Sequence, residues 1–371
     1  MSVSGDFGIV NQIEFQGRSF AGASVANYGV VETGDIVYTK SPLKSNPYGI
    51  IKANKGKNGI VSTLYAVYKP KQSANPEFVQ IYFEQDARMN NYMHPLVNKG
   101  AKNDMKVSAE NALKGQIVFP DIKEQRTISE FFHNLDTLIT LHQRKYEKLV
   151  NIKKSMLDKM FPQNGVSVPE IRFKGFTDPW EQRKLSELTS MHARIGWQNL
   201  RTSEFLDSGD YMLITGTDFD DGTVNYSTCH FVERERYEQD KNIQIRNGSI
   251  LITKDGTLGK VAYVQGLSMP ATLNAGVFNV EIRNTSIVDE RYLFQYLKAP
   301  FLMDYVDKKA TGGTIKHLNQ NILVDFPVVM PKKTEQVSIG NFFQRIDTLI
   351  TLHQREHIKP ILEVKRVKRN E

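Results

Sequence analysis

Two short segments combine glycine or acidic residues with lysine in patterns that phosphate and metal sites use. KDGTLGK at 254–260 resembles a phosphate-binding loop, but such a loop needs Ser or Thr after its lysine, and Val261 stands there. PDIKEQ at 120–125 places carboxylates beside a lysine, as nuclease metal sites do. It also stands at an expected helix start, where acidic residues favour the helix dipole. We interpret the first segment as a turn between strands and the second as a helix start.

The other candidates for chemistry are equally incomplete. SNPYG at 45–49 is similar to the Asn-Pro-Pro-Tyr motif that holds the target base in amino-group DNA methyltransferases. It lacks the second proline, no glycine-rich cofactor loop accompanies it, and we interpret it as a turn. His142 and His353 have no partners at metal-ligand spacing and are expected to pack or to set helix register. Cys229 is the only cysteine, which excludes an intramolecular disulfide and a cysteine-based zinc cluster. The sequence therefore predicts no catalytic centre and no metal site.

Positive charge is the remaining signal. The stretch 36–76 contains seven lysines and no acidic residue, with Asn, Ser and Tyr interleaved. Such a stretch can be an ordinary solvated face. It also suits duplex DNA, because Lys contacts phosphates while Asn, Ser and Lys reach base edges. The candidates for DNA contact in this half of the chain are Lys40, Ser41, Lys44, Asn46, Lys52, Lys55, Lys57, Lys102 and Lys106. Weaker equivalents in the second half are Arg194, Trp197, Gln198, Lys254, Lys260, Thr311, Thr314 and Lys316. Asn46, Ser41 and Gln198 are the predicted base-reading residues.

Overall composition is that of an ordinary soluble protein of two or three domains, at 371 residues with 40% hydrophobic and 24% charged. Forty-eight Lys and Arg against 41 Asp and Glu give a net charge of +7, which suggests a polyanionic partner without establishing one. The start of the chain has no basic and apolar signal segment, and no apolar stretch approaches the roughly 18 residues of a membrane span. We expect a cytoplasmic protein without a membrane segment.

One segment of the chain occurs twice. EQRTISEFFHNLDTLITLHQR at 124–144 and EQVSIGNFFQRIDTLITLHQR at 335–355 share 14 of 21 positions at a constant offset of 211 residues. This period is too long for a solenoid, whose units run about 20–50 residues, so it indicates a duplicated module of a globular domain followed by a helix. Such a protein presents two related working surfaces.

The repeated segment has the apolar spacing of a coiled-coil seam, in alternating steps of four and three residues. The predicted seam residues are Ile128, Phe132, Leu135, Ile139, Ile339, Phe343, Ile346 and Ile350. Unbroken, a helix over 124–160 would be about 55 Å long. Pro360 is expected to break the second helix early. Two matching seams in one chain favour packing of the two helices against each other, and the alternative is that each helix docks on its own domain.

The rest of the chain repeats a pattern of short strands and one helical stretch. GDIVYTK at 34–40 corresponds to GSILITK at 248–254, and the helical stretch VQIYFEQDARMNNYM corresponds to 290–306. GDYMLITG, KVAYV and AGVFNVEI are further expected strands, and a Pro- and Gly-rich connector follows the first helix. The predicted divisions are a first domain at 1–120, a long helix at 121–161, a connector at 162–185, a second domain at 186–331, and a second helix and tail at 332–371.

With these features the chain resembles the specificity subunits of type I restriction-modification enzymes. The resemblance is carried by the paired EQ…DTLITLHQR segments, the helix ending KKSMLDKMFP, and the connector EIRFKGFTDPWEQRKLSEL. It implies a mixed α/β (α+β) fold, with two globular target-recognition domains separated by a pair of long antiparallel coiled-coil helices. It also implies a non-catalytic subunit that reads a bipartite site in double-stranded DNA. The implied partners are two methyltransferase subunits and the restriction (endonuclease and translocase) subunits. S-adenosylmethionine, ATP and Mg belong to those partners.

Two departures from the family pattern leave alternatives open. Only 33 residues precede GDIVYTK, whereas 62 residues lie between the connector and GSILITK, so we expect the first domain to lack about thirty opening residues relative to the second. The tail REHIKPILEVKRVKRNE also differs from the helix that follows the first repeat. A truncated or recombined subunit that only binds methyltransferase is therefore the second hypothesis. A stand-alone adenine methyltransferase is the third, and it lacks the cofactor motif that it requires.

Overall fold

A computed structural model describes residues 1–18, 24–40, 46–97, 107–162, 166–309 and 318–367, the side chains of 197 and 357–367 excepted. The chain divides into two compact units, Met1–Thr140 and Leu141–Glu371. Helix α4 (Ile122–Met160), which has 39 residues, is continuous across the boundary between them. No helix in the described ranges is long and apolar enough to cross a membrane.

The first unit is built on a three-stranded antiparallel sheet in the order β5-β4-β7. All four residues of β4 are buried and β-branched or aromatic, which is the composition that a central strand requires. Two smaller antiparallel pairs, β1-β2 and β3-β6, complete the described strands of this unit. The strands are β1 (Ser2–Ser4), β2 (Gly8–Val10), β3 (Gly29–Val31), β4 (Ile36–Thr39), β5 (Ile51–Ala53), β6 (Gly59–Val61) and β7 (Tyr65–Tyr68).

Two helices close the core of the first unit, α2 (Pro76–Phe83) and α3 (Asp86–Met93), while the short α1 (Gln12–Gln16) buries no residue. Asn75 caps α2, because its side chain accepts a hydrogen bond from the Phe78 N–H at 2.9 Å and Pro76 fits the first helical position. The apolar faces of α2 and α3 pack with β4, β5 and β7 into one cluster. The predicted helical stretch VQIYFEQDARMNNYM is therefore confirmed as two helices.

The second unit holds two four-stranded sheets, in the orders β16-β15-β18-β9 and β13-β10-β17-β14, and the antiparallel pairs β8-β19 and β11-β12. In the second sheet β10 and β17 run parallel, whereas the first sheet is antiparallel throughout. The predicted strands in GDYMLITG, GSILITK, KVAYV and AGVFNVEI are confirmed as β10, β15, β16 and β18. The strands are β8 (Glu181–Lys184), β9 (Thr189–His192), β10 (Met212–Ile214), β11 (Phe219–Asp220), β12 (Thr223–Val224), β13 (His230–Phe231), β14 (Gln244–Ile245), β15 (Ile250–Thr253), β16 (Val261–Tyr263), β17 (Ala271–Leu273), β18 (Val277–Ile282) and β19 (Pro327–Met330).

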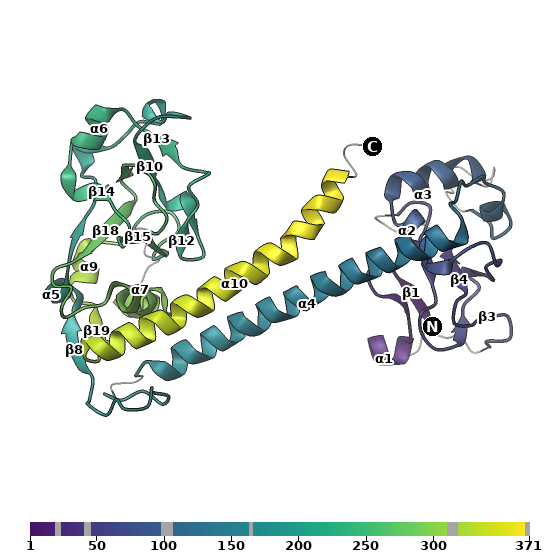
Figure 1. Ribbon diagram of the computed structural model, residues 1–371, viewed down its shortest axis with the longest axis horizontal. Coiled ribbons are helices and arrows are strands. Elements are labelled where there is room, and N and C mark those ends of the chain that lie inside the picture. The colour runs from purple at the N-terminus through teal and green to yellow at the C-terminus, as the bar shows by residue number, and fades with distance from the viewer. Residues whose placement is uncertain (19–23, 41–45, 98–106, 163–165, 310–317, 368–371) are drawn as a thin grey trace. The chain divides into compact units, whose positions relative to one another are not determined.

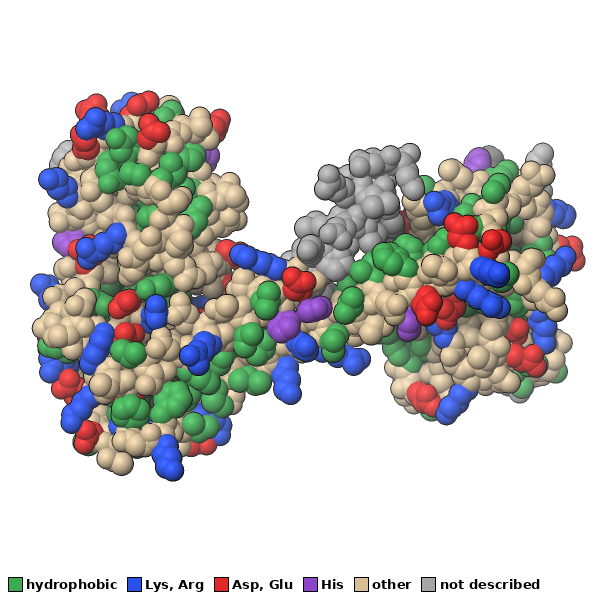
Figure 2. Space-filling model, in the orientation of Figure 1, with side chains coloured by type: hydrophobic (Ala, Val, Ile, Leu, Met, Phe, Trp, Pro, Cys, Tyr) green, Lys and Arg blue, Asp and Glu red, His purple; other side chains and the backbone are tan. Residues whose placement is uncertain are grey.

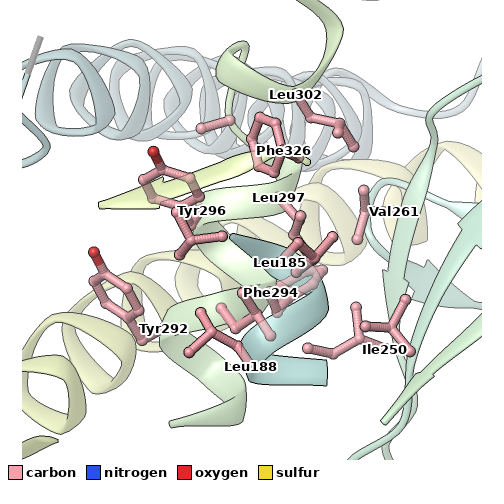
Figure 3. Packing of buried hydrophobic residues seen from close by; sticks show 14 of the residues in the cluster. Leu185, Leu188, Ile250, Val261, Tyr292, Phe294, Tyr296, Leu297, Leu302 and Phe326 are labelled. Carbon is pink, nitrogen blue, oxygen red and sulfur yellow. The ribbon is translucent and has the colours of Figure 1, made fainter. Parts of the chain in front are cut away.

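The main core of the second unit lies between the β16-β15-β18-β9 sheet and helix α7 (Glu290–Lys298). Six successive residues of α7, from Tyr292 to Leu297, are buried. Figure 3 shows Tyr292, Phe294, Tyr296 and Leu297 of this helix in one cluster with Leu185, Ile250, Val261 and Phe326. The helical stretch expected over 290–306 is confirmed, and it consists of two helices because Ala299 leaves the helical conformation ahead of Pro300. The other helices of this unit are α5 (Leu185–Leu188), α6 (Arg234–Glu238), α8 (Phe301–Lys309), α9 (Gln320–Val324) and α10 (Lys333–Val367).

Within the second unit, α10 lies antiparallel to the second half of α4 (Figure 1). His142 contacts His353, and farther along α4 Lys153 contacts Asp347. Residue numbers therefore rise along one helix where they fall along the other, as antiparallel packing requires. The residues of the predicted seam form the less exposed face of both helices. Ile339, Phe343, Ile346 and Ile350 are 0–6% exposed, with Ile339 and Phe343 in the core of the second unit, and Ile128, Phe132, Leu135 and Ile139 of the first unit are half-buried.

The expectation that Pro360 breaks the second helix is wrong, because α10 continues to Val367. A proline inside a helix removes one hydrogen bond and crowds the preceding turn, at a cost of about 3 kcal/mol, but it does not forbid the helix. Over the described residues α10 has 35 residues against 39 in α4.

The segment after α4 returns to fix the start of α10. Phe161 is 1% exposed, and its ring lies against Phe343, Trp180, Tyr292 and Tyr296. Arg172 donates to both carboxylate oxygens of Glu335 at 2.8 Å, in a pair whose carboxylate is buried. The predicted connector therefore packs into the core of the second unit and against the start of α10.

Candidate nucleic-acid interface

Lys40 and Lys254 stand at equivalent positions of two hairpins, β4–β5 and β15–β16, that have the same hydrogen bonds. In the first unit Thr39 accepts a hydrogen bond at its Oγ1 from the Ile50 N–H at 2.7 Å, and the Lys40 N–H donates to the Leu64 carbonyl. In the second unit Thr253 accepts from the Lys260 N–H at 3.0 Å, and the Lys254 N–H donates to the Gly276 carbonyl. The correspondence between GDIVYTK and GSILITK therefore extends to their hydrogen bonds.

The stretch 36–76 has no acidic residue in sequence, but neighbouring elements supply acidic residues in space. Lys52 is 7% exposed and its Nζ lies 2.6 Å from a Glu84 carboxylate oxygen. Lys55 pairs with Glu77 at 3.6 Å, and Lys69 pairs with Glu32 at 2.6 Å. The assignment of Lys52 as a DNA contact is therefore corrected, because its ammonium group is buried and already paired.

The other described candidates of the first unit differ in exposure. Lys57 is exposed and Lys40 is half-buried. The Asn46 side-chain amide donates to Asp86 at 3.2 Å, so reading a base edge would require this bond to break. Among the described candidates of the first unit, Lys57, between β5 and β6, is the best placed for a phosphate.

In the second unit, two predicted contacts prove to be interior residues. Arg194 is 1% exposed, and its guanidinium donates to the Leu273 and Gln198 carbonyls, the Gln239 side chain and Thr272. Gln198 is 4% exposed, and its side chain accepts from the Ile195 N–H. Both assignments are corrected. A buried arginine is tolerated only where acceptors surround it, so these residues brace the turn at 195–198.

Lys254 and Lys260 flank the β15–β16 turn, and they fit the predicted contact with DNA better than the buried Arg194 and Gln198 do. Lys260 is exposed, and the Lys254 Nζ lies 5.5 Å from the centre of the Phe278 ring. The turn between them closes through Gly256 and Gly259, which both have a positive φ. KDGTLGK is therefore confirmed as a strand-to-strand turn. Seven candidates lie outside the described residues, together with the side chain of Trp197: Ser41, Lys44, Lys102, Lys106, Thr311, Thr314 and Lys316.

The motifs that suggested catalysis have structural roles. Asp121 accepts from the N–H groups of Lys123 and Glu124 at 2.8 and 2.9 Å, which makes PDIKEQ the N-terminal cap of α4. The described part of SNPYG is a turn, closed at Gly49 with a φ of 84°. Over the described residues no three His, Cys, Asp or Glu side chains gather where they could hold a metal.

Two glutamines that sequence reasoning passed over join each repeat to its domain. Gln125 accepts from the Asn75 N–H at 2.8 Å and donates to the Ser73 and Pro120 carbonyls. Gln336 accepts from the Asp289 N–H at 2.9 Å and donates to the Ile287 and Pro331 carbonyls. The signal was present in the sequence, because both residues belong to the repeated EQ. Gln125 clamps the cap of α2 to the start of α4, and Gln336 clamps the cap of α7 to the start of α10.

A cleft of about 500 Å³ lies between α10, α7 and the turn that links β11 to β12. Its α10 wall is the repeated segment itself, including Thr348, Thr351 and Arg355. Asp347, also on this wall, bonds to Lys153 at 2.6 Å and to Gln295 at 2.7 Å. The lining of the cleft thus combines carboxylate, amide and guanidinium groups.

Residues 177–362, half of the chain, match the family described as type I restriction modification DNA specificity domain. The chain belongs to this family. The match covers the β15–β16 hairpin, the Gln336 clamp and the described side chains of α10. The family resemblance given by the repeated segments is thereby confirmed.

Individual relatives agree with this membership. The MjaVIII specificity subunit of Methanocaldococcus jannaschii is 23% identical over 65% of the chain and 57% of its own length. The putative MjaX specificity subunit of the same organism is 20% identical over 78% of the chain and 65% of its own length. The chain thus matches less than two thirds of either relative. The S subunit of the M. genitalium type I system has the same fold, with a TM-score of 0.51 at 13% identity, over 90% of the chain and 81% of that subunit.

Proposed function

We propose that this protein is the DNA-recognition and scaffolding subunit of a type I restriction-modification complex. The observation that carries the proposal is the duplicated plan of its two units. Each unit contains a hairpin whose first strand ends in Thr and Lys, at 39–40 and 253–254. Each unit also contains a capped helix and a buried glutamine that clamps the cap of this helix to a repeated helix. Two related domains on related helices suit a DNA site with two half-sites, each read by one domain.

The repeated helices also support docking of two copies of one partner. Leu138 and Leu141 of the first copy are 50% and 45% exposed, and the equivalent Leu349 and Leu352 of the second copy are 43% and 49% exposed. Figure 2 shows hydrophobic side chains along the exposed helix surface. Duplicated exposed leucines offer the same apolar surface twice, and we assign this surface to two methyltransferase subunits, through which restriction subunits join.

The chemistry of methylation and cleavage belongs to the partners in this proposal. S-adenosylmethionine, ATP and Mg would bind to the methyltransferase and restriction subunits, and this chain would be non-catalytic and cytoplasmic like them. Purified chain should accordingly bind no S-adenosylmethionine in calorimetry. Saturable binding by the isolated chain would instead favour a stand-alone methyltransferase.

A second candidate is a methyltransferase-binding scaffold that reads DNA poorly. Pairing of Lys52 and Lys55 with glutamates favours this alternative, because it reduces the positive charge that the first hairpin can offer to DNA. Methylome sequencing of a host that carries this gene with its partner separates the two. A bipartite methylated motif supports the recognition subunit, and methylation at a single half-site or none supports the scaffold.

The DNA interface itself is tested by Lys260→Ala in the assembled complex. A lost phosphate contact lowers the slope of log K against log salt by about 0.9 and weakens all sequences similarly. Lys174→Ala is the control, because Lys174 is an exposed lysine of the connector. If Lys260→Ala and Lys174→Ala leave affinity and slope equally unchanged, the β15–β16 turn does not contact DNA.

A further inference from the structure

His142 and His353 meet on the helix seam of the second unit. Their Nδ1 atoms are 3.0 Å apart, and their ring centres are 5.2 Å apart with a tilt of 43°. The two residues differ by 211 positions, which is the repeat offset, so they are the same residue of the two copies. When two copies of a helix pair antiparallel, equivalent residues meet only at the local two-fold axis. That axis therefore passes between these two rings.

The pair interrupts an apolar seam. The buried Ile346 and Ile350 precede His353 on α10, and the half-buried Tyr146 and Leu149 follow His142 on α4. Both histidines are themselves half-buried. The charged groups that act on His353 are Lys145 from α4 and Glu356 from α10. These two residues are also repeat equivalents, and they carry opposite charges.

The distances identify a hydrogen bond rather than a metal chelate. The separation of the ring centres exceeds that of the nitrogens by 2.2 Å, from 5.2 − 3.0, so the rings meet nitrogen to nitrogen, almost in line. Two imidazoles that share a metal at about 2.0–2.1 Å would instead aim both lone pairs at a point beside the line joining them. An in-line approach at 3.0 Å fits one Nδ1–H that donates to the lone pair of the other Nδ1.

We propose that His142 and His353 form a proton-dependent clasp, which holds the helix pair closed when they carry one Nδ1 proton between their facing nitrogens. A second proton on the facing nitrogens removes the acceptor, because both nitrogens then carry hydrogen. When both rings are also protonated at Nε2, two imidazolium charges lie in contact. The clasp then opens, and the two helices separate locally at the repeat axis.

The direction of the pH effect follows from the surroundings of His353. Its burial, and then the charges of His142 and Lys145, lower its pKa, while Glu356 opposes them. An unfolded histidine titrates near 6.5. Because the folded pKa is depressed, the clasp contributes its stability above about pH 6.5 and loses it as pH falls through the folded pKa.

One consequence rests on the proposed function. If the helix pair sets the distance between two DNA-reading domains, an open clasp changes that distance. Acidification should then weaken binding to the intact bipartite site more than binding to either half-site. The clasp itself exists or fails independently of DNA, so it is tested on the full chain alone.

Histidine NMR tests the clasp directly, with ¹⁵N-labelled protein titrated from pH 8 to 5. We expect His142 and His353 to titrate as a coupled pair, and His142→Asn to return the pKa of His353 toward its ordinary value. His133 is the internal control, because it is exposed on the same helix. Independent titration of both residues near the ordinary value, unchanged in His142→Asn, would overturn the proposal. Stoichiometric zinc binding that shifts both rings would also overturn it, in favour of a metal site.

Hydrogen exchange of the segments 139–146 and 350–356 then tests the opening, after correction for the intrinsic pH dependence. Protection in the wild type should fall at least tenfold between pH 7.5 and 5.5. The double variant His142→Asn/His353→Asn keeps a polar pair without titration and should lose the pH dependence while staying protected at pH 7.5. If the variant and the wild type respond equally to pH, the clasp is refuted. If the clasp opens but binding to the bipartite site does not change, the proposed helix spacer is refuted instead.

Discussion

Each of the two units contains a joint where a buried glutamine, Gln125 or Gln336, clamps a helix cap to the start of α4 or α10. The two joints share this glutamine clamp and differ in the residues around it. Gln125 is 1% exposed and Gln336 is 0% exposed, and each makes the same three hydrogen bonds. Around the second clamp Glu335 is buried against Arg172, whereas its equivalent Glu124 is exposed. Identical sequence thus acquires a different role where a connector folds back over it.

A second difference lies one helical turn farther on. Ser129 bonds with its hydroxyl to the Gln125 carbonyl and to the cap Asn75. The equivalent Gly340 leaves no such space, because a Cβ there would lie 2.9 Å from Arg291, Asp289 and the Tyr292 nitrogen. The second joint is therefore packed more closely than the first. The comparison suggests a common hydrogen-bonded clamp, with closer packing where α10 meets α7.

The largest expected difference is at the seam. Phe343 is 0% exposed and stacks on Phe161, whereas its equivalent Phe132 is half-buried. Phe343→Asp should cost about 4 kcal/mol or more and unfold the second unit, and Phe132→Asp should cost about half as much. Both tryptophans lie in the second unit, so urea unfolding followed by their fluorescence reports Phe343→Asp. Equal loss of structure in both variants, by hydrogen exchange, would show that the seams are equivalent.

The ion pair should give the next effect. Glu335→Gln leaves Arg172 without its partner carboxylate, and breaking a buried pair costs about 3–5 kcal/mol. Glu124→Gln is the matched control and should change stability by less than about 0.5 kcal/mol, as surface substitutions do. Denaturant midpoints of the two variants decide. A small effect for both would mean that the connector does not stabilise α10.

The glutamine clamps should respond alike. Gln125→Leu and Gln336→Leu each remove three hydrogen bonds and leave buried backbone groups unsatisfied, at a cost of about 2–3 kcal/mol. Hydrogen exchange should show loss of protection at the start of α2 in the first variant and of α7 in the second. A loss confined to one variant would contradict the view that the joints share one clamp.

The smallest effects on stability should come from exchanging Ser129 and Gly340, the equivalent residues that differ between the two joints. Gly340→Ser forces a side chain into occupied space, at a cost of about 1–3 kcal/mol. Ser129→Gly loses a hydroxyl contact and increases the backbone entropy of the unfolded chain. Together these changes should cost about 1 kcal/mol of stability. Thermal unfolding of each single variant measures the asymmetry. A neutral Gly340→Ser would show that the second joint has room to relax.

Much of the fold could be predicted from local pattern. The strands in GDIVYTK and GSILITK, the capped start of α4 and the coiled-coil seam follow from periodicity, β-branching and capping chemistry. The effect of Pro360 was predicted wrongly, because a proline lowers helix stability without deciding where a particular helix ends.

The candidate site was less predictable. The lysines of 36–76 were identified from their own charge, but Glu84, Glu77 and Glu32 pair with three of them from other parts of the fold. Arg194 has the composition of a phosphate contact, and only its burial shows that it braces a turn. Charge is a property of the sequence, whereas exposure depends on which elements pack over a side chain.

The sequence by itself determined that this protein contains a duplicated module, because the repeat, its offset and its apolar seam are written in residue order. It also placed His142 and His353 at the same position of the two copies. Only the tertiary structure decided that these residues meet, that Arg172 neutralises Glu335 and that Lys52 is paired. The physical reason is that such contacts join residues 32 to 211 positions apart, and their partners are chosen by the packing of whole elements.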